Sequence, residues 1–193
     1  MAKENKVRFG LSEIHVGTYE VTPEGTVKLG EPIALPGAIA LSLDAEGEEA
    51  SVYADDVKYW FNFEDNGFKG DLEVVRFTDE FGVKFLGKVK LDDGGIASVK
   101  GAQKPAVYMA FQSKGDKHNR RAILYNVSIA TPGKEYKTKE DKTDVATEKA
   151  SITVAGDNVT GITMAVYSED ANGYKTLFTN PPAPKKPTTG LSE

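Results

Sequence analysis

Few side chains in this sequence are placed to do catalytic chemistry. The histidines His15 and His118 stand far apart, and neither has a second metal ligand at helical spacing. The chain has no cysteine, which excludes disulfides, thiol catalysis and zinc–thiolate sites. The letters of 82–89 follow a phosphate-binding loop until Val89, which replaces the hydroxyl that binds Mg²⁺. We therefore expect no enzyme activity, no metal and no cofactor.

The densest cluster of charged side chains is acidic. A catalytic pair of carboxylates would need an apolar pocket to separate the two pKa values, and a sequence alone does not show such a pocket. A charge run of this kind is more often a solvated surface. The pattern predicts an exposed acidic bend over 44–49, followed by two further acids, and the cluster consists of Asp44, Glu46, Glu48, Glu49, Asp55 and Asp56.

The composition indicates a soluble globular protein rich in turns. The chain has 193 residues, 39% of them hydrophobic, with 9 prolines and 19 glycines, which favours many short strands in one domain. A net charge of −5 disfavours tight binding of nucleic acid. The first residues lack the apolar run of a signal peptide, and no stretch is long enough to span a membrane, so we expect synthesis in the cytoplasm and no membrane partner.

The region 105–155 carries the clearest strand pattern. Two runs, 106–112 and 121–130, flank turn residues and predict paired antiparallel strands. In the second run Ile123, Tyr125, Val127 and Ile129 are predicted to share one face, and a third strand is expected over 147–155. Between these strands lies a mixed-charge segment, 134–145, which we call the charged arm. Its charged side chains are Lys134, Glu135, Lys137, Lys139, Glu140, Asp141, Lys142 and Asp144.

Other segments complete the predicted domain. The aromatic-rich stretch 51–63 is assigned to the core, and Asn66-Gly67 to a hairpin turn. One short helix is expected over about 79–86, capped by Thr78 or Asp79 and stopped by Gly87. The Pro-rich segment 180–193 is expected to be an extended tail that does not pack, which leaves 1–179 as a single β domain.

Several segments together resemble the major tail protein, or tail tube protein, of long, non-contractile-tailed bacteriophages of Gram-positive bacteria. The resemblance covers roughly 5–179, while the N-terminal strands match loosely, and the Pro-rich end replaces an extra immunoglobulin-like domain of some relatives. The matching segments are 41–48, 53–56, 66–73 and 124–126, in this order and spacing.

The resemblance implies a fold and a function. The fold would be mainly β: a β-sandwich or half-barrel of two antiparallel sheets with one short flanking helix. The protein would assemble with itself into rings of six, which stack into a tail tube around the tape-measure protein. DNA would pass through the tube without specific binding, and the protein would reside in the virion tail after assembly in the host cytoplasm.

Two hypotheses and one alternative follow. Acidic walls leave DNA free to slide, whereas cationic walls bind phosphates, so we expect the acidic cluster to line the lumen. The charged arm carries both signs of charge and is expected to dock on a neighbouring subunit; the alternative for it is a disordered surface loop. A β-sandwich that recognises carbohydrate or cell wall is the competing function, and it would require exposed aromatic residues where the core assignment buries them.

Overall fold

The computed structural model describes residues 10–54, 56–113, 119–134 and 146–186. The described part is mainly β with one short helix, which confirms the predicted fold class. The order of elements is β1 (Leu11–Val21), β2 (Val27–Leu29), β3 (Ile33–Ala34), β4 (Ala38–Ala54), β5 (Val57–Val74), α1 (Asp79–Phe85), β6 (Lys88–Lys90), β7 (Ile96–Ser98), β8 (Val107–Ser113), β9 (Arg121–Ile129), β10 (Glu148–Val154) and β11 (Met164–Tyr167).

Nine of the described strands form one antiparallel sheet, and β6 and β7 form a small second sheet. The order β2-β1-β8-β9-β10-β5-β4 places β1 and β5 four positions apart, yet Ile14 of β1 and Leu72 of β5 belong to one buried cluster. The amide of Leu35, just before β4, also donates to the carbonyl of Ile14 at 2.8 Å. The sheet therefore curls until its two ends approach each other around a common core.

The helix α1 packs on this core as the sequence predicts. The Thr78 hydroxyl accepts a hydrogen bond from the Phe81 amide at 3.2 Å, which satisfies one of the free amides of the first turn. Phe81 and Phe85 are buried, and their ring centroids lie 5.0 Å apart. A helix of 7 residues is too short to be stable alone, so its stability comes from this buried face.

Strand β9 differs from the prediction because it changes face at Asn126. This residue has a φ of 53°, in the left-handed region, and the β8–β9 register shifts between Val107 and Met109. As a result Tyr125 packs in a second buried cluster on the other side of the sheet, whereas Val127 packs in the first. The single face predicted for 123–129 is thus wrong.

The C-terminal segment covers the second cluster. Leu177 is fully buried there, and the Tyr125 hydroxyl donates to the carbonyl of Pro182 at 2.9 Å. Pro181 is buried as well. The expectation that the Pro-rich segment does not pack is therefore wrong for these two prolines; residues 187–193 lie outside the described part.

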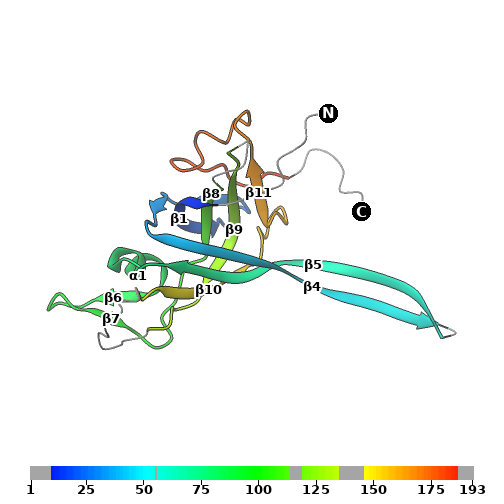
Figure 1. Cartoon of the computed structure of the whole chain (residues 1–193), viewed down its shortest axis with the longest axis horizontal. Helices are drawn as coiled ribbons and strands as arrows, with labels where there is room; N and C mark the ends of the chain where they lie inside the picture. Colours follow the sequence, from blue (N-terminus) through cyan, green and yellow to red (C-terminus); the bar gives the residue numbers. More distant parts are fainter. Residues whose placement is uncertain (1–9, 55, 114–118, 135–145, 187–193) are drawn as a thin grey trace.

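Strands β4 and β5 form a hairpin that leaves the body of the molecule (Figure 1). Within the described chain, β5 pairs with both β4 and β10 only over Phe68–Val74. We call residues 45–67, where β4 and β5 pair with each other alone, the long hairpin. Its existence corrects two predictions: 44–49 is strand, not a bend, and Asn66-Gly67 lies within β5, not in a turn.

Candidate assembly surfaces

The acidic residues singled out in the sequence lie along β4 and at its tip. Between Asp44 and Ala54 the strand rises ~33 Å, at ~3.3 Å per residue. Asp44 and Glu48 are exposed, and Glu46 forms an ion pair with Lys69. The structure therefore places these carboxylates in a row from root to tip and does not gather them into one site. The backbone of Glu49 belongs to the same row, Asp56 is exposed at the tip, and Asp55 lies outside the described residues.

The hairpin holds its charges differently from the body. Glu48 and Glu64 are cross-strand partners, both exposed, and like charges placed opposite each other destabilise a strand pair. In the body, Lys149 lies 3.0 Å from Asp71 and, together with Ser151, lowers the pKa of that carboxyl. The hairpin's acidic pair has no such ion pair in the part of the chain that the structure describes.

The tip of the long hairpin exposes large apolar side chains. Val57 is 65% exposed and Tyr59 is 80% exposed, which makes Tyr59 the most exposed large hydrophobic residue of the described chain. They are two residues apart on β5, where the register with β4 shifts between Val52 and Tyr53 and leaves Tyr59 without a partner in β4. The prediction that 51–63 supplies the core is wrong for these two residues; the side chains of Tyr53, Trp60, Phe61 and Phe63 are not among those described.

Two glycines hold the root of the hairpin against its neighbours. A Cβ on Gly67, whose φ is 103°, would lie 2.0 Å from the carbonyl oxygen of Val154 in β10. A Cβ on Gly70 would lie 1.8 Å from the carbonyl oxygen of Ser42 in β4. Only glycine permits these close backbone approaches, so the two positions set the angle at which the hairpin leaves the body.

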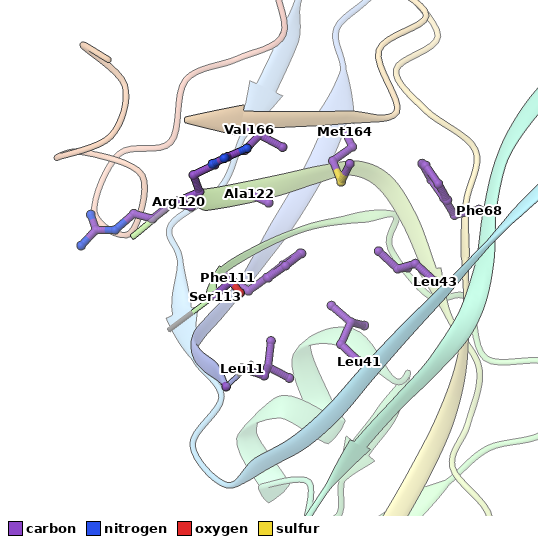
Figure 2. Close-up of a pocket in the computed structure, with 12 residues that line it drawn as sticks. Leu11, Leu41, Leu43, Phe68, Phe111, Ser113, Arg120, Ala122, Met164 and Val166 are labelled. Carbon is purple, nitrogen blue, oxygen red and sulfur yellow. The ribbon is translucent and has the colours of Figure 1, made fainter. Parts of the chain in front are cut away.

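An open apolar groove lies in the body, between β4 and β11. Figure 2 shows Leu41 and Leu43 of β4 on one side, Met164 and Val166 of β11 on the other, and Phe111 of β8 between them. Its volume is about 420 Å³. Among the described strands, β4 pairs only with β5 and β11 only with β9, so each bounding strand has one unpaired edge.

One end of the groove is held by a stacked group of side chains. The guanidinium of Arg121 lies 4.1 Å from the ring centroid of Tyr174 and 4.4 Å from that of Phe178. The imidazole ring of His15 stacks on the ring of Phe178, with 4.7 Å between the two centroids. Arg121 also donates to the Tyr174 carbonyl at 2.7 Å. These contacts fasten the C-terminal segment to β9 and account for His15 as a packing residue.

One carboxylate is buried, and its hydrogen bonds indicate a structural role. Asp157 accepts from the Tyr19 hydroxyl at 2.5 Å and from the Thr160 amide at 2.6 Å. Burial alone would raise the pKa of Asp157, but the hydrogen bonds from Thr160 and Tyr19 outweigh it and lower the pKa below 3.8. Burial and the bond to Asp157 raise the pKa of Tyr19 to about 12. The sequence analysis missed this pair, although the Asp-x-x-Thr spacing after Gly156 signals such a turn.

The remaining predictions are resolved only in part. Of the charged arm, Lys134 is exposed, and 135–145 lie outside the described residues, as does His118. In the described ranges no three His, Cys, Asp or Glu side chains gather as a metal site would require. Nor does any helix in these ranges have the length and apolar character needed to cross a membrane. The 82–89 segment with phosphate-loop letters begins inside α1.

Comparisons with known proteins give similarity at the level of the fold. No protein-family model matches the sequence, and no curated protein matches it. Among solved structures, the sheath/tube terminator of an extracellular contractile injection system (PVC) in its extended state has 12% identity and a TM-score of 0.47, over 86% of this chain and 100% of that one. The PVC sheath–tube complex, also extended, has 10% identity and a TM-score of 0.46, over 84% and 93%. The tube-terminating cap of the anti-feeding prophage has 8% identity and a TM-score of 0.46, over 87% of this chain and 97% of that one. Similarity this low does not assign a function to the chain.

Proposed function

We propose that this protein is a structural subunit of a bacteriophage tail tube and assembles with copies of itself. The observation that carries the proposal is the long hairpin, which projects from the body with exposed Val57 and Tyr59 at its tip (Figure 1). An isolated two-stranded hairpin is marginally stable in water. When it extends away from the core, it adds no buried surface that would stabilise the fold. A second copy that covers it would supply the missing buried surface.

The unpaired strand edges support the same proposal. The edges of β4 and β11 present free backbone donors and acceptors that can pair with another chain. A contact between two different surfaces of identical copies gives a ring if the rotation closes and a filament if it does not. The finer form of the proposal, based on the sequence resemblance, is stacked rings of six around a tape-measure protein.

The acidic row supports a role as a conduit. A wall that carries Asp44, Glu48 and the other acids of β4 would repel phosphates and leave DNA free to move. We propose that these carboxylates face the lumen. Replacing all six by the corresponding amides in a virion should leave tubes intact and slow DNA delivery; unchanged infectivity of the substituted virion would contradict a lumenal position.

Assembly can be tested with a hairpin deletion. In the variant, 46–66 are replaced by an Asn-Gly turn, which leaves every strand of the body in place. We expect the full-length protein to form tubes or rings at high concentration in negative-stain microscopy and analytical ultracentrifugation. The deletion variant should unfold at a similar temperature and remain a monomer. A full-length protein that stays monomeric at all concentrations and salt conditions would overturn the proposal.

The charged arm remains a proposed second contact. Its mixture of both signs suits salt-sensitive pairs with a neighbouring subunit, each worth ~0.2–1 kcal/mol when exposed. Deleting 135–145 should give a folded protein that polymerises poorly. Normal tubes from this deletion would identify the segment as a surface loop.

Carbohydrate recognition is the second candidate because Tyr59 is exposed, as a sugar-binding surface requires. A binding module would retain cell-wall polysaccharide in a pull-down, and Tyr59→Ala would abolish this retention. A tube subunit would show no retention and would lose assembly with the same substitution.

A further inference from the structure

The hairpin tip and the apolar groove have complementary chemistry. The tip presents two exposed apolar side chains, Val57 and Tyr59, and the groove is lined mainly by aliphatic and aromatic side chains. Met164 and Val166, at its rim, are 38% and 51% exposed. When the two surfaces meet, apolar area is removed from water, which stabilises the contact by ~25 cal/mol per Å² buried. A groove of about 420 Å³ can hold large side chains of this kind.

The charges around the two surfaces also match. The groove has Arg120 and Arg121 at one end, and no carboxylate is among its described lining residues. The tip carries Asp56, and Glu64 follows further along the same strand. Arg121 is held by Tyr174 and Phe178, so the positive charge of this end attracts carboxylates without requiring a new ion pair. A hairpin that approaches the groove therefore brings acids toward a positively charged end.

The tip cannot reach the groove of its own molecule. The hairpin projects from the body (Figure 1). Its tip lies on the order of 30 Å from its root, whereas the groove is lined by Leu41, Leu43 and Phe68 beside that root. Any contact between them therefore joins two copies. Each copy has one tip and one groove, which makes the contact heterologous and able to propagate.

We propose that the tip of the long hairpin of one copy, through Val57 and Tyr59, docks in the apolar groove between β4 and β11 of the next copy. This inference rests on the proposed function and specifies which two surfaces meet. The docked hairpin lies beside the unpaired edges of β4 and β11, so it can also contribute backbone hydrogen bonds. The acids nearer the root stay outside the groove and remain available to line a lumen.

The first experiment is a complementation test between two defective variants. The tip variant carries Val57→Ser and Tyr59→Ser, and the groove variant carries Val166→Glu. Each alone should remain monomeric in analytical ultracentrifugation, with its self-association weakened on the order of 10-fold or more, as for loss of a buried aromatic anchor. Mixed in equal amounts, they should form a 1:1 dimer and stop there, because the mixture holds one working tip and one working groove. Val99→Glu, on an equally exposed valine after β7, is the matched control and should assemble like the original chain.

The second experiment uses the absence of cysteine in the chain. Copies with Val57→Cys, which keeps the aromatic ring of Tyr59, and copies with Val166→Cys, mixed and treated with a short bis-maleimide, should give one crosslinked dimer, whereas Val57→Cys with Val99→Cys should give none. Crosslinking of Val57→Cys to Val99→Cys in place of Val166→Cys would overturn the proposal.

The outcomes separate this inference from the function on which it rests. If the original chain assembles and the tip and groove variants assemble equally well, the docking is wrong and the tube function stands. If the original chain never assembles, both are wrong. Matching thermal unfolding of all variants shows that a loss of assembly is not a loss of fold.

Discussion

The long hairpin continues two strands of the body, β4 and β5, but the two regions are stabilised in different ways. In the body, β5 places Leu72 and Val74 in the buried core, between β10 and β4. At its other end, the same strand carries Val57 and Tyr59 in water. The body pairs its surface carboxylate Asp71 with Lys149, whereas the hairpin sets Glu48 opposite Glu64.

This contrast separates folding from assembly. The body has its own buried core, so it can fold as a single copy. None of the hairpin side chains that the structure describes belongs to the buried clusters, and Val57 and Tyr59 at the tip are exposed. Substitutions in the buried core should therefore change the free energy of unfolding, and those at the hairpin tip should change association.

The largest loss of stability is expected from Phe81→Ala. Phe81 is 1% exposed and contacts the rings of Phe77 and Phe85, so its removal leaves a cavity between α1 and the sheet. We expect the free energy of unfolding to fall by about 3–5 kcal/mol. Urea denaturation followed by circular dichroism measures this, and a loss below 1 kcal/mol would show that α1 does not belong to the cooperative core.

A smaller loss, about 1–3 kcal/mol, is expected from Asp157→Asn at neutral pH. The amide cannot accept all the hydrogen bonds that Tyr19 and Thr160 donate to the carboxylate. Because the folded pKa of Asp157 lies below 3.8, its contribution is complete above that pH and disappears as the pH falls through the folded value. The stability difference between the original chain and the variant should shrink accordingly in acid.

Tyr19→Phe is the control for this site and tests the alkaline limit. The folded pKa of Tyr19, about 12, exceeds its usual 10.0, so the contribution of the neutral phenol is complete below pH 10 and is lost as the pH rises toward 12. The variant should show a weaker alkaline decline in stability than the original chain. Equal declines would place the alkaline transition elsewhere in the molecule.

The smallest change in stability is expected from the double substitution at the hairpin tip, Val57→Ser with Tyr59→Ser. Both side chains are mostly in water, so the free energy of unfolding of a dilute, monomeric sample should change by less than ~0.5 kcal/mol. Thermal denaturation at low concentration measures it. A loss comparable to that of Phe81→Ala would mean that the hairpin is part of the core after all.

The sequence predicts local elements well where one signal dominates. Thr78 caps α1 as expected, and Ala150, Ile152 and Val154 alternate inward on β10. Alternation fails on β9, because the left-handed backbone of Asn126 moves the following side chains to the opposite face. A period of two residues cannot show where a bulge resets it.

Sequence patterns predict neither the long hairpin nor the groove. Alternating aromatic residues in 51–63 are typical of a buried strand, and nothing local shows that Val57 and Tyr59 of this stretch are exposed. Asn66-Gly67 has the letters of a turn, but the positive φ of Gly67 serves a close approach to β10. The groove combines residues from separate strands, such as Leu41, Phe111 and Val166, which only the curled sheet brings together.

The two glycines lie at the root of the hairpin, so a small change of the backbone there would move the distant tip a long way. A methyl group at Gly67 or Gly70 would force neighbouring backbone apart, and the length of the hairpin would magnify that small tilt into a large swing of its tip. Identical copies joined tip to groove would then meet at a different angle. Whether such copies close into a ring or continue as an open helical filament would then depend on these two positions, where glycine has a hydrogen atom in place of a Cβ.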